Sequence, residues 1–191
     1  MSSLDKLKEQ NLAAYLDALA AKTSTPGGGT VAAVVAAEAC SLVAMVANFS
    51  KDETAKEIAG RAHASVENLL ELGERDALAF ESVMKAFKGE GDVSSACKQA
   101  ADIPAQVIGI CLTHLGDLEY LAAQGNPNLI TDTAIASLLF DSALKSSELN
   151  ILINMKSFDA IPEDLESAIN SVPGATTRLQ FIASTIRTGL S

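Results

Sequence analysis

The chain has 191 residues, of which 48% are hydrophobic but only 4% aromatic, and its formal charge is −10. This length predicts one domain spanning residues 1–191, large enough to bury about two-thirds of its unfolded surface. The negative charge excludes the basic face that a nucleic-acid partner requires. Because no apolar signal segment opens the chain, we expect a cytoplasmic protein. Cys40, Cys97 and Cys111 show no C-x-x-C spacing and are expected to be reduced, buried thiols.

Apolar residues recur at helical spacing along most of the chain and no segment alternates with period two, which predicts an all-α fold. An amphipathic helix is expected over Leu4–Lys22, ended by a glycine-rich turn. The next segment, Val31–Phe49, is apolar nearly all round, so we expect a central helix buried on most sides. Its length and the charge of Glu38 favour a core helix over a membrane span.

The rest of the chain predicts further helices separated by polar, Gly or Pro breaks. Pro104 should kink or split one of them, and Pro162 with Pro173-Gly174 should divide the tail. Thr131 or Asp132 is the expected N-cap of the fifth helix. The expected spans are about 53–88, 94–124, 131 or 132 to about 155, one short helix, and 175–187. The sequence therefore predicts a bundle of about five to seven helices with long central helices, and its apolar surface predicts a homodimer.

The glycine turn Thr25-Pro26-Gly27-Gly28-Gly29-Thr30 precedes the central helix. Pro26 biases Thr25 toward extended conformations, and the glycines permit backbone shapes and close approaches that other residues forbid. Thr30 is the expected N-cap. Two interpretations stay open, a flexible turn and a cradle whose N–H groups bind an anion or a polar ligand. The pattern matches neither the dinucleotide nor the Walker motif, so it does not support a nucleotide site.

Asp76 lies in the middle of an apolar stripe on the predicted third helix. A carboxylate on a core-facing line is costly unless it has a partner or faces a wet cleft. Gly73, one turn earlier, leaves room that a ligand ring would need. Asp76 is therefore either a functional carboxylate or a structural one bonded to a helix end or an arginine. The stripe consists of Ile58, Ala62, Val66, Leu69, Gly73, Phe80, Met84 and Phe87.

Polar residues gather at both ends of the predicted fifth helix. Asn126, Asn128 and Asp132 surround its start, where turn formation and capping would also explain them. Asn150 and Asn154 lie four residues apart on one face among apolar residues, so their amides require partners. Those partners are either a ligand or loop backbone.

The two histidines give no metal signature. His114 lies on an apolar stripe and is expected to be a core residue with satisfied hydrogen bonds. His63 lies off the stripe of its own helix and is expected on the surface. No cluster of acidic or thiol ligands accompanies either one, so we expect neither a metal nor another cofactor.

Between about Leu12 and Lys156 the chain resembles the formiminotetrahydrofolate cyclodeaminase and methenyltetrahydrofolate cyclohydrolase family. No single motif is decisive, but their order and spacing together are specific. The motifs are TPGGG at 25–29, MVAN at 45–48, DALAF at 76–80, VMKA at 83–86, ADIP at 101–104, GNPN at 125–128, TD at 131–132 and NILIN at 150–154.

The resemblance implies an all-α homodimer whose substrate is a tetrahydrofolate derivative. The implied reactions are ring closure of 5-formiminotetrahydrofolate with ammonia release, or hydrolysis of 5,10-methenyltetrahydrofolate to 10-formyltetrahydrofolate. Both need proton transfer at a carbon between two nitrogens, which a tuned carboxyl group performs well. The family's candidate catalytic carboxylate falls on Asp76. The substrate-binding residues implied are Thr25, Pro26, Gly27, Gly28, Gly29, Asn126, Asn128, Asp132, Asn150 and Asn154.

The sequence departs from the family pattern at residues 50–56, where a Lys-rich segment containing Tyr is replaced by SKDETAK. A cysteine proposed as catalytic in some members has no match in register, because Cys97 is displaced. These departures favour an alternative, a non-catalytic homodimer that binds a folate-like ligand or has a regulatory role. A purely structural helical dimer is the third possibility.

Overall fold

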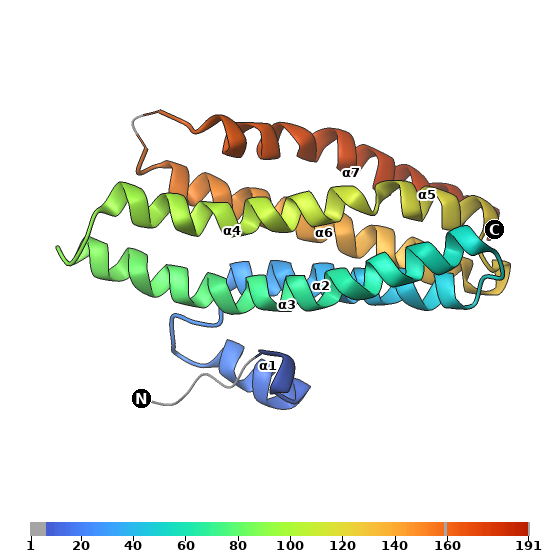
Figure 1. Ribbon diagram of the computed structural model, residues 1–191, viewed down its shortest axis with the longest axis horizontal. Coiled ribbons are helices and arrows are strands. Elements are labelled where there is room, and N and C mark those ends of the chain that lie inside the picture. Colours follow the sequence, from blue (N-terminus) through green and yellow to red (C-terminus); the bar gives the residue numbers. More distant parts are fainter. Residues whose placement is uncertain (1–6, 159, 191) are drawn as a thin grey trace.

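The structure, a computed structural model, describes residues 7–158 and 160–190, and this part of the chain is all-α, as predicted. Long helices lie side by side in an elongated bundle, α5 continues α4, and the short α1 lies outside the bundle (Figure 1). The helices are α1 (Leu12–Ala20), α2 (Gly28–Asn48), α3 (Glu53–Phe87), α4 (Val93–Thr113), α5 (Leu115–Gln124), α6 (Ile130–Met155) and α7 (Glu163–Gly189), with 3₁₀ turns at Leu7–Glu9 and Pro127–Leu129.

The central position predicted for the second helix is confirmed, because α2 packs between α3 and α6 with most of its surface buried. Its alanines let both neighbours approach closely. By length and composition α2 could cross a membrane, but 61% of its most apolar window is buried inside the protein, as in a core helix. Cys40, Cys97 and Cys111 are free and buried, as expected. Burial raises the pKa of Cys40 to about 12, so this thiol stays protonated.

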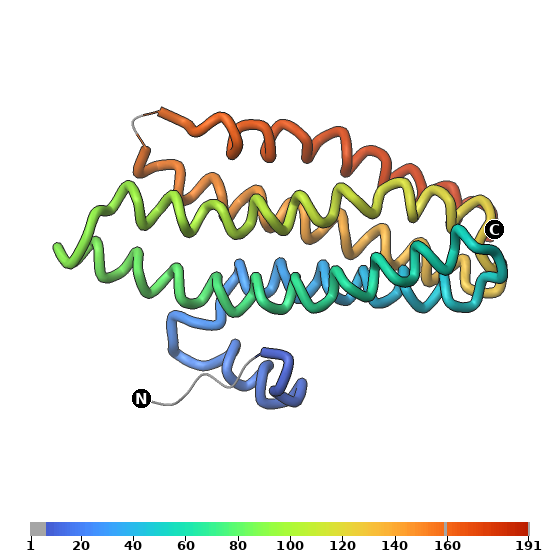
Figure 2. Tube along the Cα trace, viewed as in Figure 1, coloured from blue at the N-terminus to red at the C-terminus, as the bar shows by residue number. Residues whose placement is uncertain are grey.

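The unequal lengths of α2 and α3 create a gap at one end of the bundle. The 21 residues of α2 span about 32 Å and the 35 residues of α3 about 52 Å. Because a short turn joins the two helices, α3 extends well past the start of α2 (Figure 2). Phe80, Met84 and Phe87 on this extension are 39%, 41% and 60% exposed. The predicted core stripe is therefore wrong for these three residues, since no α2 side chains cover them.

The expected single N-terminal helix is wrong within the described residues. A 3₁₀ turn over Leu7–Glu9 precedes α1, and the Asn11 side chain caps α1 by accepting from the Ala14 N–H at 2.9 Å. The predicted start at Leu4 lies outside the described residues. Tyr15 is the buried residue of α1, whereas Leu12 and Leu16 are exposed.

Three predictions about proline and capping residues were also wrong. Pro104 does not split its helix, because α4 is continuous from Val93 to Thr113 and the break comes at His114 instead. Pro173 lies inside α7, which runs from Glu163 to Gly189 as one helix. Buried residues on both sides of each proline hold the helix together although one backbone hydrogen bond is lost. The fifth expected helix, α6, begins at Ile130 without any side-chain cap, so Thr131 and Asp132 lie in its first turn.

A buried polar network holds the break between α4 and α5. His114, 1% exposed, places Nδ1 2.9 Å from Asp117 Oδ2 and Nε2 2.9 Å from Ser65 Oγ. Its ring also stacks on Phe140. Burial raises the pKa of Asp117, but hydrogen bonds from His114 and Arg61 outweigh burial and leave that pKa lowered. His114 is thus the satisfied core residue that the sequence predicted, and His63 is exposed as expected.

Replacing His114 with Phe should lower the free energy of unfolding by about 1–3 kcal/mol for each buried partner left without its hydrogen bond. The partners are the half-buried Ser65 and the buried Asp117, and Asp117 keeps its hydrogen bond from Arg61. Urea denaturation measures this change. His63→Phe is the matched control and should change stability by no more than about 0.5 kcal/mol, because His63 is exposed. Equal stabilities of the two variants would contradict a structural role for the network.

Candidate active site

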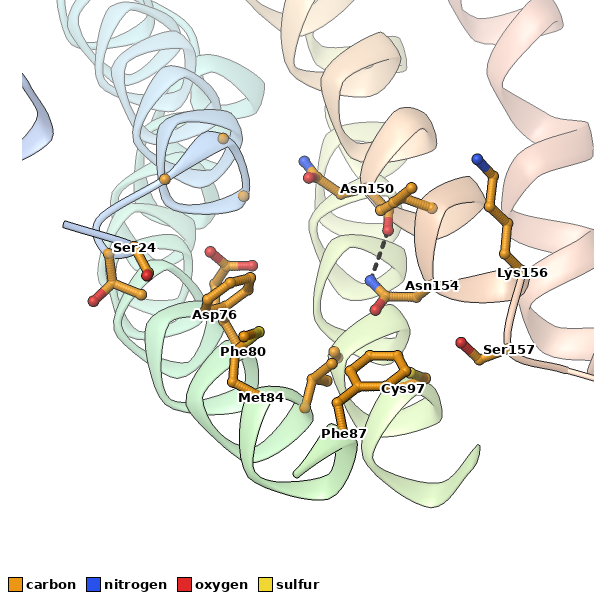
Figure 3. Close-up of a pocket in the computed structure, with 17 residues that line it drawn as sticks. Ser24, Asp76, Phe80, Met84, Phe87, Cys97, Asn150, Asn154, Lys156 and Ser157 are labelled. Atoms are coloured by element: carbon orange, nitrogen blue, oxygen red, sulfur yellow. Dashed lines mark hydrogen bonds between the residues drawn. The ribbon is translucent and has the colours of Figure 1, made fainter. Parts of the chain in front are cut away.

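A pocket of about 520 Å³ opens at the end of the bundle where α3 extends past α2 (Figure 3). One side carries the start of α2 and Asp76 of α3, and the facing side carries two asparagines of α6. Its lining residues are Ser24, Thr25, Gly27, Gly28, Gly29, Asp76, Phe80, Val83, Met84, Phe87, Cys97, Ala100, Asn150, Ile153, Asn154, Lys156 and Ser157.

Asp76 is the only carboxylate among the described residues that line this pocket. The Thr30 hydroxyl lies 3.3 Å from Asp76 Oδ2 and 3.2 Å from the Gly73 carbonyl oxygen, so the two acceptors share its single proton. Burial raises the pKa of Asp76, and hydrogen bonds from the Thr30 hydroxyl and backbone N–H only partly offset this increase. A carboxyl group with a raised pKa is suited to accept a proton and return it.

The glycine turn brings the start of α2 against Asp76. A Cβ atom on Gly29 would lie 2.0 Å from Asp76 Oδ1, so only glycine permits this approach. Gly28 has room, because its Cβ would lie 3.9 Å from Asn150 Oδ1. Gly27 has φ −138° and ψ −161°, which is ordinary extended backbone. The glycines therefore serve close approach at one position, and none of the three has a positive φ.

Thr30 does not cap α2, which corrects the expectation from sequence. Gly27 is the N-cap residue and makes no side-chain hydrogen bond, so α2 already begins at Gly28. Thr30 lies in the first turn, where its side chain is buried and contacts α3. The carboxyl group of Asp76 instead lies at the positive end of α2, which favours its ionised form.

Asn150 and Asn154 present acceptors to the pocket. Their Nδ2 atoms donate to carbonyls one turn earlier in α6, Asn150 to Ser146 O and Asn154 to Asn150 O, each at 2.9 Å. Among the described residues, no donor bonds to either Oδ1 atom. The amide nitrogens are thus satisfied by their own helix, and the amide oxygens are left for a ligand.

Pro26 and Gly73, both singled out in the sequence, border a neighbouring cavity of about 390 Å³ between α1 and the α2–α3 pair. Pro26, which follows a cis peptide bond, lines this cavity, whereas Thr25 borders both. A Cβ atom on Gly73 would lie 3.0 Å from Leu7 Cδ2 and 3.6 Å from Ala33 Cβ. Gly73 therefore permits close packing of Leu7 and α2 against α3, and the cavity that it borders is not the pocket that Asp76 lines.

Asn126, Asn128 and Asp132 lie at the opposite end of α6. The 22 residues from Asp132 to Asn154 correspond to about 33 Å along the helix. Asn126 donates through Nδ2 to the Phe49 carbonyl at 3.2 Å, and its backbone N–H donates to Ser50 Oγ at 3.1 Å. Its Oδ1 accepts from the Asn128 N–H at 3.0 Å. Within one subunit these three residues therefore take no part in the pocket.

Several lining residues were not proposed as site residues from the sequence. Phe80, Met84 and Phe87 were assigned to the core, and the available signal was that the third helix is much longer than the second. Lys156 at the pocket rim had no signal beyond its place after the last asparagine. No group of three or more metal-binding side chains gathers anywhere in residues 7–158 and 160–190.

The fold and the pocket together define a class of protein: an all-α bundle that holds one half-buried carboxyl group, amide acceptors and aromatic side chains around one cavity. Residues 11–170 match the family model described as formiminotransferase-cyclodeaminase. The chain therefore belongs to this family, as its motifs indicated.

Known members resemble the chain in sequence and fold. The methenyltetrahydrofolate cyclohydrolase of Methylorubrum extorquens is 28% identical over 169 residues, which cover 78% of this chain and 81% of that protein. The formimidoyltransferase-cyclodeaminase of Rattus norvegicus is 27% identical over 187 residues, 87% of this chain but only 35% of the rat protein. The crystal structure of formiminotetrahydrofolate cyclodeaminase from Thermotoga maritima superposes with a TM-score of 0.85 at 33% identity, covering 94% of this chain and 98% of that chain.

Proposed function

We propose that the protein is a folate one-carbon enzyme that closes the ring of 5-formiminotetrahydrofolate and releases ammonia. The observation that carries this proposal is the raised pKa of Asp76. Among the described residues that line the pocket, Asp76 is the only one with a carboxyl group. The structural relative that matches along nearly its whole length is named as a cyclodeaminase, which supports this reaction.

The formimino group reacts in its protonated form, C=NH2+, so the reaction requires one further proton to move from N10 to the nitrogen that leaves. N10 attacks the formimino carbon, a carbon–nitrogen bond forms, and the carboxylate of Asp76 accepts the proton that N10 loses. The bond from that carbon to the amino nitrogen then breaks as Asp76 returns the proton to it, and ammonia leaves. The product is the 5,10-methenyl cation, and Asp76 ends in the state in which it began.

The pocket offers a complementary group for each part of a folate. Phe80 and Phe87 supply apolar surface for the ring system, and the Oδ1 atoms of Asn150 and Asn154 accept from its N–H groups. Lys156 is exposed at the rim, where it suits the carboxylates of the glutamate tail. A volume of about 520 Å³ lies within the usual range for small-molecule sites.

The second candidate is hydrolysis of 5,10-methenyltetrahydrofolate, favoured by the similarity to the Methylorubrum cyclohydrolase. In that reaction water attacks the methenyl carbon and gives one proton to Asp76. The bond from that carbon to N5 breaks as Asp76 delivers this proton to N5, and the remaining hydroxyl proton leaves to solvent. Purified protein should be mixed with 5-formiminotetrahydrofolate or 5,10-methenyltetrahydrofolate while the methenyl absorbance is followed. A gain from the first substrate supports the cyclodeaminase, whereas loss from the second above the buffer rate supports the cyclohydrolase. If the protein binds both folates but converts neither, the non-catalytic ligand-binding alternative is supported instead.

The departures at residues 50–56 lie far from this pocket in the same subunit, at the start of α3. Asp52 caps α3 by accepting from the Ala55 N–H at 2.9 Å and accepts from the Tyr120 hydroxyl at 2.6 Å. The segment therefore has a structural use within the subunit. A homodimer in the cytoplasm, expected from the sequence, remains part of the proposal.

A further inference from the structure

The Thr30 hydroxyl bonds to a different helix from its own. The Thr30 side chain is 2% exposed, and its hydroxyl lies 3.2 Å from the Gly73 carbonyl oxygen and 3.3 Å from Asp76 Oδ2, both on α3. Several other helical hydroxyls bond back to a carbonyl of their own helix, as Ser41 does at 2.8 Å to the residue four places earlier. For Thr30 the residue four places earlier is Pro26, which lies outside α2, so the hydroxyl is available to α3.

This hydroxyl has one proton for two acceptors. Both O···O distances exceed the roughly 2.8 Å of an ordinary O–H···O bond, as expected when one proton is shared. A charged acceptor forms the stronger hydrogen bond, so the proton points at Asp76 while its carboxyl group is ionised. When Asp76 is neutral, the Gly73 carbonyl is the better acceptor, because an amide oxygen accepts more strongly than a carboxylic acid. The buried hydroxyl therefore has a partner in either state and needs only a rotation about its C–O bond.

We infer that Thr30 is a positioning residue, which holds Asp76 Oδ2 and leaves Asp76 Oδ1 to exchange the proton with the substrate. Among the described residues, no side chain bonds to Oδ1, and Figure 3 shows the carboxyl group beside the start of α2. Holding one oxygen restricts the rotation of the carboxyl group, so the other oxygen stays in one place. Thr30 itself neither loses nor gains a proton. The role in turnover rests on the proposed function, whereas the contact between Thr30 and Asp76 does not.

The methyl group of Thr30 restricts the direction of its hydroxyl. A Cβ atom on Gly73 would lie 3.6 Å from Thr30 Cγ2, so the methyl group packs against the bare backbone of α3. Branching at Cβ also limits the rotamers of the side chain. Serine keeps the hydroxyl without the methyl group, and valine keeps the shape without the donor. These two substitutions therefore separate the hydrogen bond from the packing.

Burial and Thr30 together determine the pKa of Asp76. Burial raises this pKa, and hydrogen bonds from the Thr30 hydroxyl and backbone N–H lower it. The other ionisable side chains that line the pocket and the neighbouring cavity, within the described residues, are Cys97, Lys156, Glu74 and Tyr15. None of these four contributes to the shift. Because the hydroxyl bonds more strongly to the carboxylate than to the neutral acid, its removal should raise the pKa of Asp76 further.

Titration of Thr30→Val and Thr30→Ser without substrate tests the contact. Carboxyl-carbon NMR follows Asp76, whose signal is identified by its absence from Asp76→Asn. The midpoint should lie about 0.5–1 pH unit higher in Thr30→Val than in the wild-type protein, and Thr30→Ser should stay close to the wild-type value. The matched control is Thr176→Val, another buried threonine, whose hydroxyl bonds to the Pro173 carbonyl of its own helix at 3.0 Å. Its Asp76 midpoint should not move.

An unchanged midpoint in Thr30→Val, or the same increase in Thr30→Ser or Thr176→Val, would overturn the contact as the cause. If Thr30→Val does not fold, Thr30→Ala removes the same hydroxyl without adding a methyl group and must show the higher midpoint.

The pH dependence of kcat tests the role in turnover. Ionised Asp76 accepts the proton in the proposed reaction, so kcat should rise with pH through the midpoint found by NMR. In Thr30→Val this midpoint should move to higher pH by the same amount, and the plateau rate should fall about ten- to a hundredfold because the carboxyl group can rotate. Thr30→Ser should recover the midpoint and most of the plateau rate.

A purely structural Thr30 would lower the melting temperature of Thr30→Val but leave the kcat midpoint in place, and this result would overturn the positioning role. If the wild-type protein converts neither folate, the proposed function fails, and the NMR titration still decides whether Thr30 holds Asp76.

Discussion

Asp76→Asn should abolish turnover while the protein stays folded. Asparagine keeps the shape of the side chain and can still accept from Thr30 through its amide oxygen, but it cannot take up and return a proton. The loss of a general acid or base lowers the rate by at least about a hundredfold. Steady-state kinetics with both folate substrates measures the rate, and ligand affinity should change far less. A near-wild-type rate would remove Asp76 from the mechanism.

The same variant should be more stable than the wild-type protein at neutral pH. Burial raises the pKa of Asp76 above its ordinary value of 3.8, so folding favours the protonated carboxyl group. The stability contributed by Asp76 is therefore full below the ordinary pKa and is lost as pH rises through the raised, folded-state value. Thermal unfolding should show an advantage for Asp76→Asn at pH 7 that disappears at pH values below 3.8. A variant less stable at pH 7 would indicate that Asp76 is a structural carboxylate.

The sequence was sufficient where one strong local pattern determines the outcome. The apolar run before Phe49 predicted the buried α2, and the polar break at Asp52 predicted the start of α3. Asp76 was recognised because a carboxylate within an apolar stripe contradicts the pattern around it. The family motifs added the identity of the fold, which the superposition with the Thermotoga cyclodeaminase confirms.

The sequence failed to predict features that depend on contacts between different helices. Phe80 and Phe87 share the periodicity of the buried residues, but exposure depends on where α2 begins, which a pattern within α3 does not contain. Thr30 has the residue type of an N-cap, yet its hydroxyl bonds to α3, 43 residues away. Pro104 and Pro173 break isolated helices, but tertiary packing on both sides keeps these helices whole.

The separation of Asn126 and Asp132 from Asn154 shows a different limit. All of these residues fall on family motifs, and sequence places them in one site without regard to subunit. The length of α6 makes that impossible within one copy.

Gly29→Ala should abolish turnover almost as completely as the loss of Asp76 itself. Its Cβ would lie 2.0 Å from Asp76 Oδ1 and 2.4 Å from Asp76 Cγ, so the carboxyl group must leave the start of α2. Displacement of about 1 Å from a catalytic geometry costs on the order of a hundredfold in rate. The fold should survive, because the short Asp76 side chain can rotate toward the open pocket. Kinetics and thermal unfolding should be measured on the same preparation.

Gly28→Ala is the matched control, since its Cβ would make only an ordinary contact of 3.9 Å with Asn150 Oδ1. Both substitutions lie in the first turn of α2 and bring the same gain in helix propensity. Any difference in turnover therefore isolates the contact with Asp76. Gly28→Ala should retain the wild-type rate within a few-fold. If the two variants are equally active, the close approach of α2 to Asp76 has no part in catalysis, and Gly29 serves only the turn.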